Sequence, residues 1–269
     1  MIFLQYILPQ HFLSKLMFRF AKIETLWIKN TCTRWFVNKY NVNLAEAEIE
    51  NIEDYINFND FFTRALKPNL RPISESKLIS PVDGVVSQVG KIQDSQIIQA
   101  KGRQYSTSEL LVDKASEELE NGSFATIYLS PKDYHRIHMP CDGVLISMKY
   151  IPGNLFSVNQ KTVNQVKRVF ARNERLICLF DTDFGVMAFV LVGAIFVGSM
   201  QTEWQGQITP PYSNKVINYD YKGREIRLAK GDELGRFNMG STVIMLLPEK
   251  STEINLIEGQ ELKMGQAII

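Results

Sequence analysis

The apolar residues near the N-terminus recur at the spacing of a helix. In LPQHFLSKLMFRFAKI (8–23), large apolar side chains return every three or four residues, and the polar side chains fall mostly between them. That period is typical of an α-helix with one apolar face, and Pro9 suits a first helical turn. We therefore expect an amphipathic helix in this segment.

The same region carries an excess of positive charge. Residues 1–40 contain one acidic side chain, Glu24, and six basic ones: Lys15, Arg19, Lys22, Lys29, Arg34 and Lys39. A basic amphipathic helix accompanied by aromatic residues, here Trp27 and Trp35, is typical of a segment that lies in a membrane interface. A surface helix packed on its own domain has the same pattern, so the residues alone leave both interpretations open.

Further along, the periodicity changes from helical to strand-like. We expect an acidic helix over 44–55, and Pro68 and Pro72 end the helical region. From about residue 78, short β-rich runs alternate with turn signals, interrupted by one expected helix around 106–119. We predict an α+β fold: N-terminal amphipathic helices in a helical region (1–72), then a β-rich domain (73–269) with a mainly antiparallel core of sandwich or barrel type.

The longest apolar run, VMAFVLVGAIFVG (186–198), has 13 residues. A helix needs about 20 residues to span a bilayer, and this run is rich in β-branched residues and interrupted by Gly193. We therefore interpret it as a buried strand.

The motif P-x-D-G-V occurs twice, as PVDGV (81–85) and PCDGV (140–144). Asp-Gly favours a tight turn, so a turn role is the simplest explanation of Asp83 and Asp142 and should hold for at least one of them. A duplicated half-barrel would also produce such a repeat. The residues alone do not choose between the two aspartates.

Composition narrows the function classes. A net charge of +1 argues against a dedicated nucleic-acid binder. The three cysteines are widely spaced and form no C-x-x-C, so neither a disulfide framework nor a zinc site is expected, and a reducing cytosolic setting fits best.

Candidate chemistry is concentrated in two stretches. FNMGSTVIM (237–245) places Gly240 and Ser241 inside a strand-like apolar segment, where glycine marks a bend or a close approach. SPKDYHRIHMP (130–140) holds His135 and His138. No further ligands complete H-x-x-H as a metal site, and the neighbouring Asp, Tyr and Arg favour a catalytic role.

Three stretches resemble the phosphatidylserine decarboxylases, proenzymes that make their own pyruvoyl group: PVDGVVSQVG, YHRIHMPCDG and FNMGSTVI. The resemblance runs in order over nearly the whole chain and is close to the bacterial type. It includes QYILPQHFLSKL, FNDFFTRALKPNLRPI, IPGNLFSVN, ARNERLICLFDTDFG, VGAIFVGSM and GQITPP. Met239 replaces the usual leucine before Gly-Ser-Thr, a change between side chains of nearly equal volume.

The resemblance implies self-cleavage. The Ser241 hydroxyl attacks the Gly240 carbonyl, and β-elimination of the resulting ester leaves chains 1–240 and 241–269, the second beginning with a pyruvoyl group. By the family pattern His138 is the general base and Asp83 orients it, which is the logic of a serine triad. Asp83 is thus chosen over Asp142 by resemblance only.

The resemblance also implies a reaction and a setting. The pyruvoyl group forms a Schiff base with phosphatidylserine, carbon dioxide leaves, His135 returns a proton, and phosphatidylethanolamine is released. The covalent pyruvoyl is the expected cofactor, with neither metal nor pyridoxal phosphate. A lipid substrate favours the membrane interpretation of residues 1–40, and we expect a peripheral enzyme on the cytoplasmic side of the cell membrane. A homodimer of cleaved protomers is expected from family habit, and no nucleic-acid partner.

Three alternatives remain. A pyruvoyl decarboxylase of a soluble amino acid would share the chemistry but not the N-terminal anchor. A serine hydrolase would use Asp83, His138 and Ser241 in that order, but no G-x-S-x-G elbow surrounds Ser241. A non-enzymatic lipid-binding β-sandwich would have the strands and the anchor without the cleavage.

Overall fold

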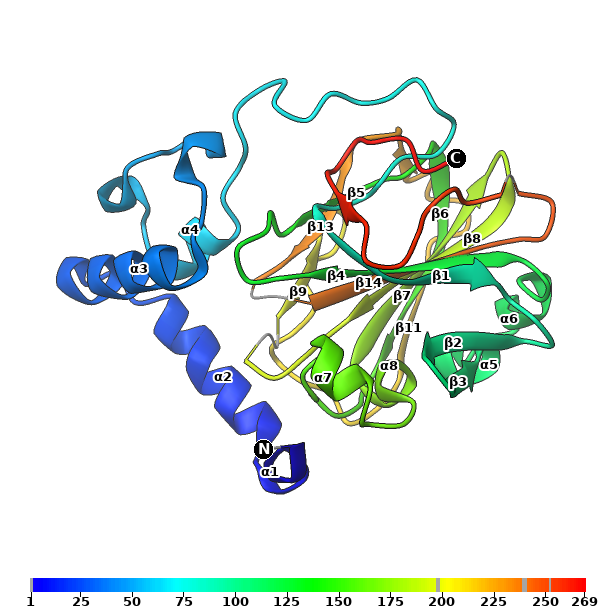
Figure 1. Ribbon diagram of the computed structural model, residues 1–269, viewed down its shortest axis with the longest axis horizontal. Coiled ribbons are helices and arrows are strands. Elements are labelled where there is room, and N and C mark those ends of the chain that lie inside the picture. The colour runs from blue at the N-terminus through cyan, green and yellow to red at the C-terminus, as the bar shows by residue number, and fades with distance from the viewer. Residues whose placement is uncertain (1, 197–198, 239–240, 252) are drawn as a thin grey trace.

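The longer helices precede the strands along the chain and lie to one side of them (Figure 1). The computed structural model describes residues 2–196, 199–238, 241–251 and 253–269. The helices are α1 (Ile2–Ile7), α2 (Gln10–Ala21), α3 (Leu26–Tyr40), η1 (Leu44–Glu46), η2 (Ile52–Asp54), α4 (Phe58–Phe62), α5 (Thr107–Leu111), α6 (Ala115–Glu118), α7 (Gln160–Val163) and α8 (Val169–Arg172). The strands are β1 (Gly84–Lys91), β2 (Gln96–Ala100), β3 (Arg103–Ser106), β4 (Ser123–Leu129), β5 (Arg136–His138), β6 (Gly143–Ile151), β7 (Arg175–Thr182), β8 (Gly185–Val192), β9 (Met200–Thr202), β10 (Gly206–Gln207), β11 (Ile217–Asp220), β12 (Arg227–Leu228), β13 (Glu233–Phe237), β14 (Ser241–Leu247) and β15 (Glu261–Leu262).

Two of the expected helices are confirmed. The amphipathic pattern forms α2, which begins directly after Pro9. The helix expected around 106–119 begins with a capping box in which Ser106 and Glu109 bond each other's backbone N–H groups. It is interrupted at Val112, whose backbone is left-handed, so it forms α5 and α6 rather than one helix.

The acidic helix expected over 44–55 is wrong. The segment forms only the short 3-10 helices η1 and η2. Between them the backbone pairs with residues far along the chain: Glu48 N–H donates to Ala65 O at 3.0 Å, and Lys67 N–H donates to Glu46 O at 3.0 Å. This pairing uses backbone groups that a continuous helix would need for itself.

The β core consists of antiparallel sheets, as the sequence predicted. The largest follows the order β11-β6-β7-β8-β14-β4-β1-β15, with β12 also paired to β6. A second sheet has the order β10-β9-β13-β5, and β2 pairs with β3. The apolar run from residue 186 forms β8, a buried strand that ends at Val192. Because β8 and β14 lie at the centre of the large sheet and are buried along most of their length, they read as continuous apolar stretches.

The repeated P-x-D-G-V motif marks two copies of one structural unit. In each copy a long strand begins directly after the Asp, β1 at Gly84 and β6 at Gly143. Gly84 pairs with Leu262 of β15, and Gly143 pairs with Leu228 of β12. The duplication that the motif suggested is therefore present in the backbone.

The two copies meet at the centre of the large sheet, one as β6, β7 and β8 and the other as β1, β4 and β14. In the first, a short hairpin turn joins β7 to β8, with Thr182 opposite Gly185. At the equivalent point of the other copy, Leu129 of β4 lies opposite Ser241 of β14. The intervening chain, 130–240, contains all of the β6–β8 copy. One unit is thus inserted into a hairpin of the other.

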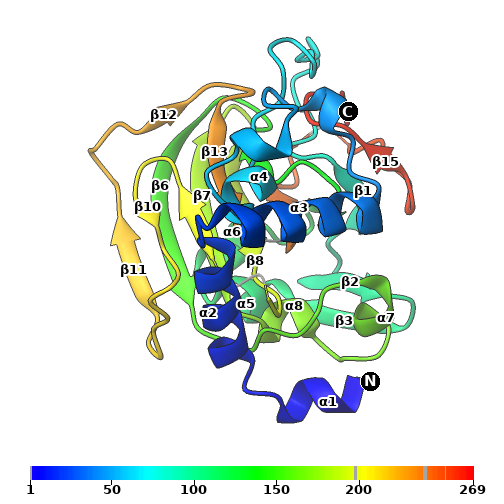
Figure 2. The same ribbon diagram turned by 90° about the vertical axis from the view of Figure 1, so that its left-hand side faces the viewer.

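The N-terminal helices have a small core of their own. The buried side chains Phe36, Tyr55, Phe58, Phe61 and Phe62 pack together, separately from the main core of the sheets. Helices α2 and α3 pass across the face where α4 lies (Figure 2). Across the described residues, no helix combines the length and the apolar character needed to cross a bilayer.

Candidate active site

The segment predicted to be cut lies between two fixed backbone contacts. On one side, Phe237 at the end of β13 donates its N–H to His135 O at 3.2 Å. On the other, Ser241 begins β14 opposite Leu129, the last residue of β4. Gly240 lies outside the described residues. The chain from Leu129 to His135 therefore connects the two flanks of the predicted cleavage site.

His135 is fully buried, with its ring 4.2 Å from that of Phe62. Its Nδ1 lies 2.8 Å from the carbonyl oxygen of Asp133. A carbonyl only accepts, so Nδ1 carries the proton and Nε2 carries a lone pair. Within the described part of the chain, Nε2 has no hydrogen-bond partner. Burial lowers the pKa of His135 to about 3, so the ring is a neutral base near pH 7.

His138 lies in β5 and is also mostly buried. Its Nδ1 donates to Gly231 O at 2.7 Å, so Nε2 accepts from the Tyr134 hydroxyl at 2.9 Å. Burial lowers the pKa of His138. The ring therefore has the tautomer that a general base needs, with its lone pair on Nε2. The two histidines are three residues apart, and in an extended chain such positions point to opposite faces.

Asp83 holds a network of charged groups. Its carboxylate is buried and accepts from Arg71 at 2.6 and 3.1 Å, from Lys263 at 3.2 Å and from Met264 N–H at 2.8 Å. Burial by itself would raise the pKa of this carboxyl, but the hydrogen bonds from Arg71 and Met264 outweigh it and the pKa is lowered. Asp83 is therefore ionised.

The structure does not join Asp83 to His138 by a hydrogen bond between described atoms, and the orienting contact on His138 Nδ1 comes from Gly231 O. The triad roles of Asp83, His138 and Ser241 stay predictions. Asp142, the other aspartate of the repeat, is exposed and accepts from Lys230 N–H at 2.6 Å. The residue directly precedes β6, and its bond to Lys230 joins segments far apart in the chain, so the tight turn expected at the Asp-Gly pairs stays a prediction.

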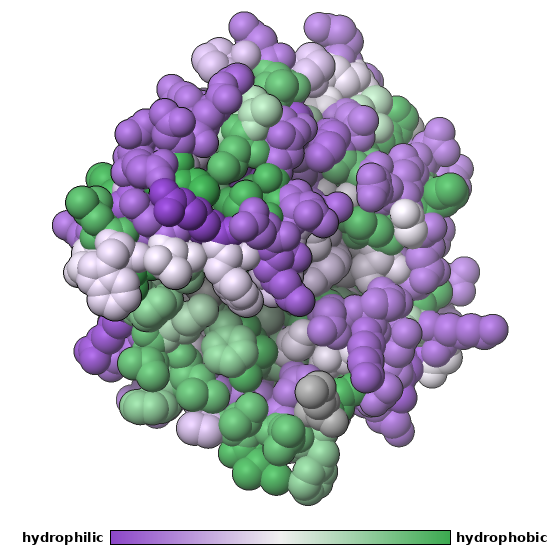
Figure 3. All heavy atoms as spheres, turned by 60° about the vertical axis from the view of Figure 1, so that its left-hand side comes forward, coloured by the Kyte–Doolittle hydropathy of each residue, from purple (hydrophilic) through white to green (hydrophobic). Residues whose placement is uncertain are grey.

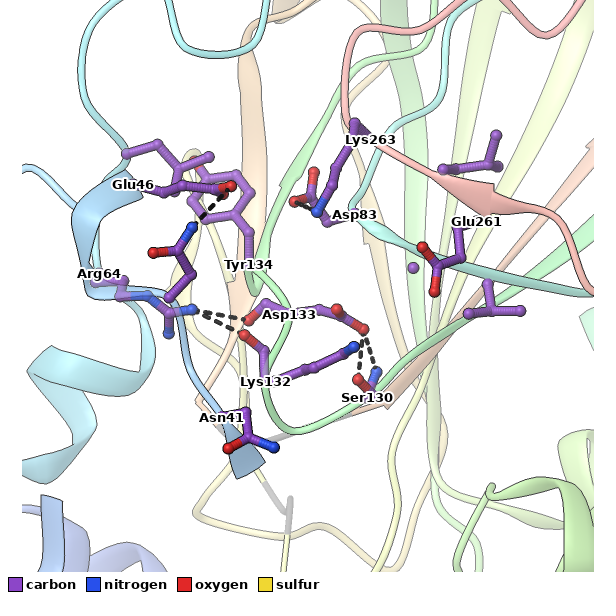
Figure 4. A pocket seen from close by; sticks show the side chains of 15 residues that line it. Asn41, Glu46, Arg64, Asp83, Ser130, Lys132, Asp133, Tyr134, Glu261 and Lys263 are labelled. Carbon is purple, nitrogen blue, oxygen red and sulfur yellow. Dashed lines mark hydrogen bonds and ion pairs between the residues drawn. The ribbon is translucent and has the colours of Figure 1, made fainter. Parts of the chain in front are cut away.

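Two pockets flank the loop 130–135. A polar pocket of about 360 Å³ is shown in Figure 4; its lining includes Glu46, Arg64, Asp83, Ser130, Asp133 and Lys263. An apolar pocket of about 430 Å³ lies between the N-terminal helices and β4; its lining includes Trp35, Phe36, Tyr40, Phe58, Phe62 and Leu129. The first faces the Asp83 network, and the second reaches Leu129, the partner of Ser241. One loop thus separates a polar space from an apolar one.

Sequence reasoning did not single out Arg64, Arg71 or Tyr134 as residues of this site. All three lie within stretches that carry the resemblance, so their motifs were visible, but their contacts come from elements far apart in the chain. As for metals, no group of three or more His, Cys, Asp or Glu side chains suited to an ion occurs in the described ranges.

Two buried histidines follow the loop that starts opposite Ser241, and a polar and an apolar pocket lie on either side of that loop. Comparison with known proteins identifies the family. A family profile described as phosphatidylserine decarboxylase matches residues 58–269, and a second, described as PSD, matches residues 1–41. The chain belongs to the phosphatidylserine decarboxylase family.

Curated relatives resemble the chain over nearly its whole length. The phosphatidylserine decarboxylase proenzyme of Methylobacillus flagellatus is 52% identical over 248 residues, covering 91% of this chain and 89% of the relative. That of Saccharophagus degradans is 53% identical over 252 residues, covering 92% and 88%. That of Vibrio parahaemolyticus is 49% identical over 271 residues, covering 97% and 95%.

Proposed function

We propose that this chain cuts itself between Gly240 and Ser241 and then converts phosphatidylserine to phosphatidylethanolamine and carbon dioxide. The observation that carries the proposal is the position of Ser241 at the start of β14, opposite Leu129 and at the edge of the loop that holds His135. Membership of the decarboxylase family supports the same reaction.

For maturation, we assign His138 as the base that takes the Ser241 hydroxyl proton. Its Nδ1–H is held by Gly231 O, and its Nε2 lone pair is covered by the Tyr134 hydroxyl. The Tyr134 hydroxyl has to turn away before Nε2 can accept another proton. Asp83 supplies negative charge near the ring, which favours the imidazolium once it forms.

For decarboxylation, a pyruvoyl group at residue 241 would supply a ketone that condenses with an amine and withdraws electrons from the bond to the carboxylate. The unpartnered Nε2 of His135 fits such a group, because it is a buried lone pair on a residue whose carbonyl oxygen bonds Phe237, four residues before Ser241. Since His135 is neutral, it has to gain a proton during the reaction before it can donate one. Its Nε2 would then give that proton to the α-carbon, which is the donor role predicted from the resemblance.

The N-terminal helices supply the proposed membrane contact. Large apolar side chains on α1, α2 and α3 are exposed: Phe3, Leu4, Ile7, Phe12, Leu16 and Trp27. Figure 3 shows hydrophobic residues gathered on the lower part of the face that these helices turn outward. Water does not stabilise such a surface, whereas a membrane interface does. The basic residues of α2 would add attraction to anionic lipid.

These helices are also fastened to the core beside the apolar pocket. Gln10 Oε1 accepts from Leu155 N–H at 2.6 Å, Gln5 Oε1 accepts from Ser157 N–H at 2.8 Å, and the Ser14 hydroxyl accepts from Phe196 N–H at 3.1 Å. A lipid entering from the membrane surface would thus meet the apolar pocket next to the helices. We retain region 1–72 as the membrane-associating part, the cytoplasmic face of the membrane as its location, and a homodimer of cleaved protomers as the assembly.

The test compares the wild-type protein with Ser241→Ala. Wild type should run as two chains, 1–240 and 241–269, with the smaller lacking a free amino terminus by intact mass, and should release carbon dioxide from labelled phosphatidylserine. Ser241→Ala should remain one inactive chain. A serine hydrolase or a lipid-binding sandwich would keep the wild-type chain whole, and a decarboxylase of a soluble amino acid would cleave but ignore the lipid.

A further inference from the structure

Arg64 is a buried cation with unused hydrogen-bond donors. It follows α4 and is 5% exposed. One nitrogen, Nη2, donates to Lys132 O at 2.9 Å and lies 3.5 Å from Asp133 O. Its Nε and Nη1 are buried, and in the described part of the chain neither has a hydrogen-bond partner. The guanidinium remains charged at neutral pH.

Two other arginines with buried side chains, Arg175 and Arg71, have partners within the described part of the chain. Arg175 is 2% exposed and donates through Nε, Nη1 and Nη2 to the carbonyl oxygens of Leu110, Asn173 and Glu109. Arg71 is paired with the carboxylates of Asp83 and Glu46. An unpaired buried charge is unfavourable, so the two free donors of Arg64 indicate a partner that comes from outside the chain.

Arg64 shares its pocket with four carboxylates, those of Glu46, Asp83, Asp133 and Glu261, but none of them is paired with it. Arg64 lines the polar pocket, and the carboxylate of Asp133 points away from it toward Ser130, to which it is hydrogen-bonded (Figure 4). The carboxylates of Glu46 and Asp83 are already paired with Arg71, and Lys263 adds a further positive charge to Asp83. No carboxylate of a described residue lies within ion-pair distance of Arg64, so its charge is not neutralised within the pocket.

Arg64 is also next to His135. The same carbonyl oxygen, that of Asp133, accepts from His135 Nδ1 at 2.8 Å and lies 3.5 Å from Arg64 Nη2. The guanidinium and the ring proposed to protonate the substrate thus share one backbone oxygen. In a phosphoserine headgroup only three covalent bonds separate the α-carbon from phosphorus, so one molecule can reach both residues.

We propose that Arg64 binds the phosphodiester of the phospholipid substrate through its Nε–H and Nη1–H groups. This inference rests on the proposed decarboxylase function. Two donors of one planar guanidinium match two phosphate oxygens. The substrate also carries a carboxylate, but a cation held on the departing carboxylate would stabilise the reactant more than the transition state and slow the reaction. The phosphodiester keeps its charge throughout.

The experiment uses Arg64→Met and Arg64→Lys, with Arg168→Met as the matched control. Arg168 lies on the surface, paired with Glu109 and away from the site. The substrate is dihexanoyl phosphatidylserine, which is soluble as a monomer, so the N-terminal anchor does not affect the measurement. We expect both variants to cleave into two chains. In Arg64→Met the KM should rise about 30-fold or more, as for loss of one partner of a buried charge pair, with a smaller change in kcat. The KM of Arg64→Lys should lie between those of the wild type and Arg64→Met, because lysine keeps the charge without the planar pair of donors.

Glycerophosphoethanolamine shows whether Arg64 binds the phosphodiester or the carboxylate of the substrate, because it has the phosphodiester but no carboxylate. Its inhibition constant, and its dissociation constant by calorimetry, should rise in Arg64→Met by about the same factor as the KM. A raised KM with unchanged glycerophosphoethanolamine binding would assign Arg64 to the carboxylate and overturn the proposal, as would an unchanged KM. If neither variant cleaves itself, Arg64 serves maturation and the proposal is wrong. A wild-type protein that releases no carbon dioxide would instead refute the proposed function, while the calorimetric comparison would still decide the role of Arg64.

Discussion

Substitution of Asp83 by asparagine tests whether this carboxylate acts on the cleavage reaction or only holds the fold. Asparagine keeps the shape but removes the charge that binds Arg71 and Lys263. Breaking a buried ion pair from one side costs about 3–5 kcal/mol. Arg71 keeps Glu46 at 2.5 Å, and the Lys263 side chain is 49% exposed and can be hydrated. We therefore expect the lower end, about 3 kcal/mol, which corresponds to a fall in melting temperature of roughly 6–12 °C.

Arg71→Met is the matched control, because it breaks the same ion pair and leaves the Asp83 carboxylate in place. It should lower the melting temperature by a similar amount. If Asp83 assists His138, Asp83→Asn should slow self-cleavage by about 10²-fold or more, while Arg71→Met matures at a rate much closer to wild type. The measurements are calorimetric unfolding and a time course of cleavage on denaturing gels at a temperature where both variants are folded.

Two results would refute this reasoning. Equal slowing in both variants would mean that the network acts through the stability of the fold. Wild-type cleavage in Asp83→Asn would remove Asp83 from the mechanism, and the carbonyl of Gly231, which already holds His138 Nδ1, would then suffice to orient the base.

Three further predictions concern the histidines, the helices and acid stability. His135→Ala should still cleave but turn over phosphatidylserine about 10²–10⁴-fold more slowly, whereas His138→Ala should stay largely uncleaved; the opposite pattern on gels and in carbon dioxide release would reverse the two roles. Removal of residues 1–24, or serine in place of the exposed Leu4, Ile7 and Phe12, should shift the protein from membranes to the soluble fraction, and high salt should do so only in part; full sedimentation of these variants with membranes would place the anchor elsewhere. Because the folded-state pKa of His135 is lowered to about 3, the unfolded chain binds a proton below about pH 6.5 that the native state does not, so stability should fall as the pH decreases from about 6.5 toward 3. Urea unfolding should show that the free energy of unfolding falls by about 2 kcal/mol between pH 7 and pH 5 because of this group. His135→Asn should lack this contribution to the pH dependence.

Much of the architecture could be predicted because it follows from local patterns. The apolar period of α2 and the continuous apolar strands β8 and β14 depend on neighbouring residues, and all are present. The 44–55 segment could not be predicted in this way. Its helical propensity is overridden by backbone pairing with residues 65–67, which no local pattern reports.

The contacts of the site could not be predicted from the sequence either. The sequence singles out His138, but the carbonyl that sets its tautomer lies 93 residues away at Gly231. Asp83 receives its N–H donor from Met264, 181 residues along the chain. The unused donors of Arg64 are a property of burial and of missing partners, so they become visible only when the packing is known.

The insertion of one structural unit into a hairpin of the other means that the large sheet is completed before the proposed self-cleavage. Strand β14, which begins with Ser241, is synthesised after β4 and β8, yet it lies between them at the centre of the large sheet. Ser241 therefore takes its place opposite Leu129 only when β14 has paired with these earlier strands. Self-cleavage would then report that folding is complete: a chain whose sheet stays open remains whole and inert. The same placement would hold the piece 241–269 in the sheet after such a cut, since its release would break the ladders of β14 with both β4 and β8.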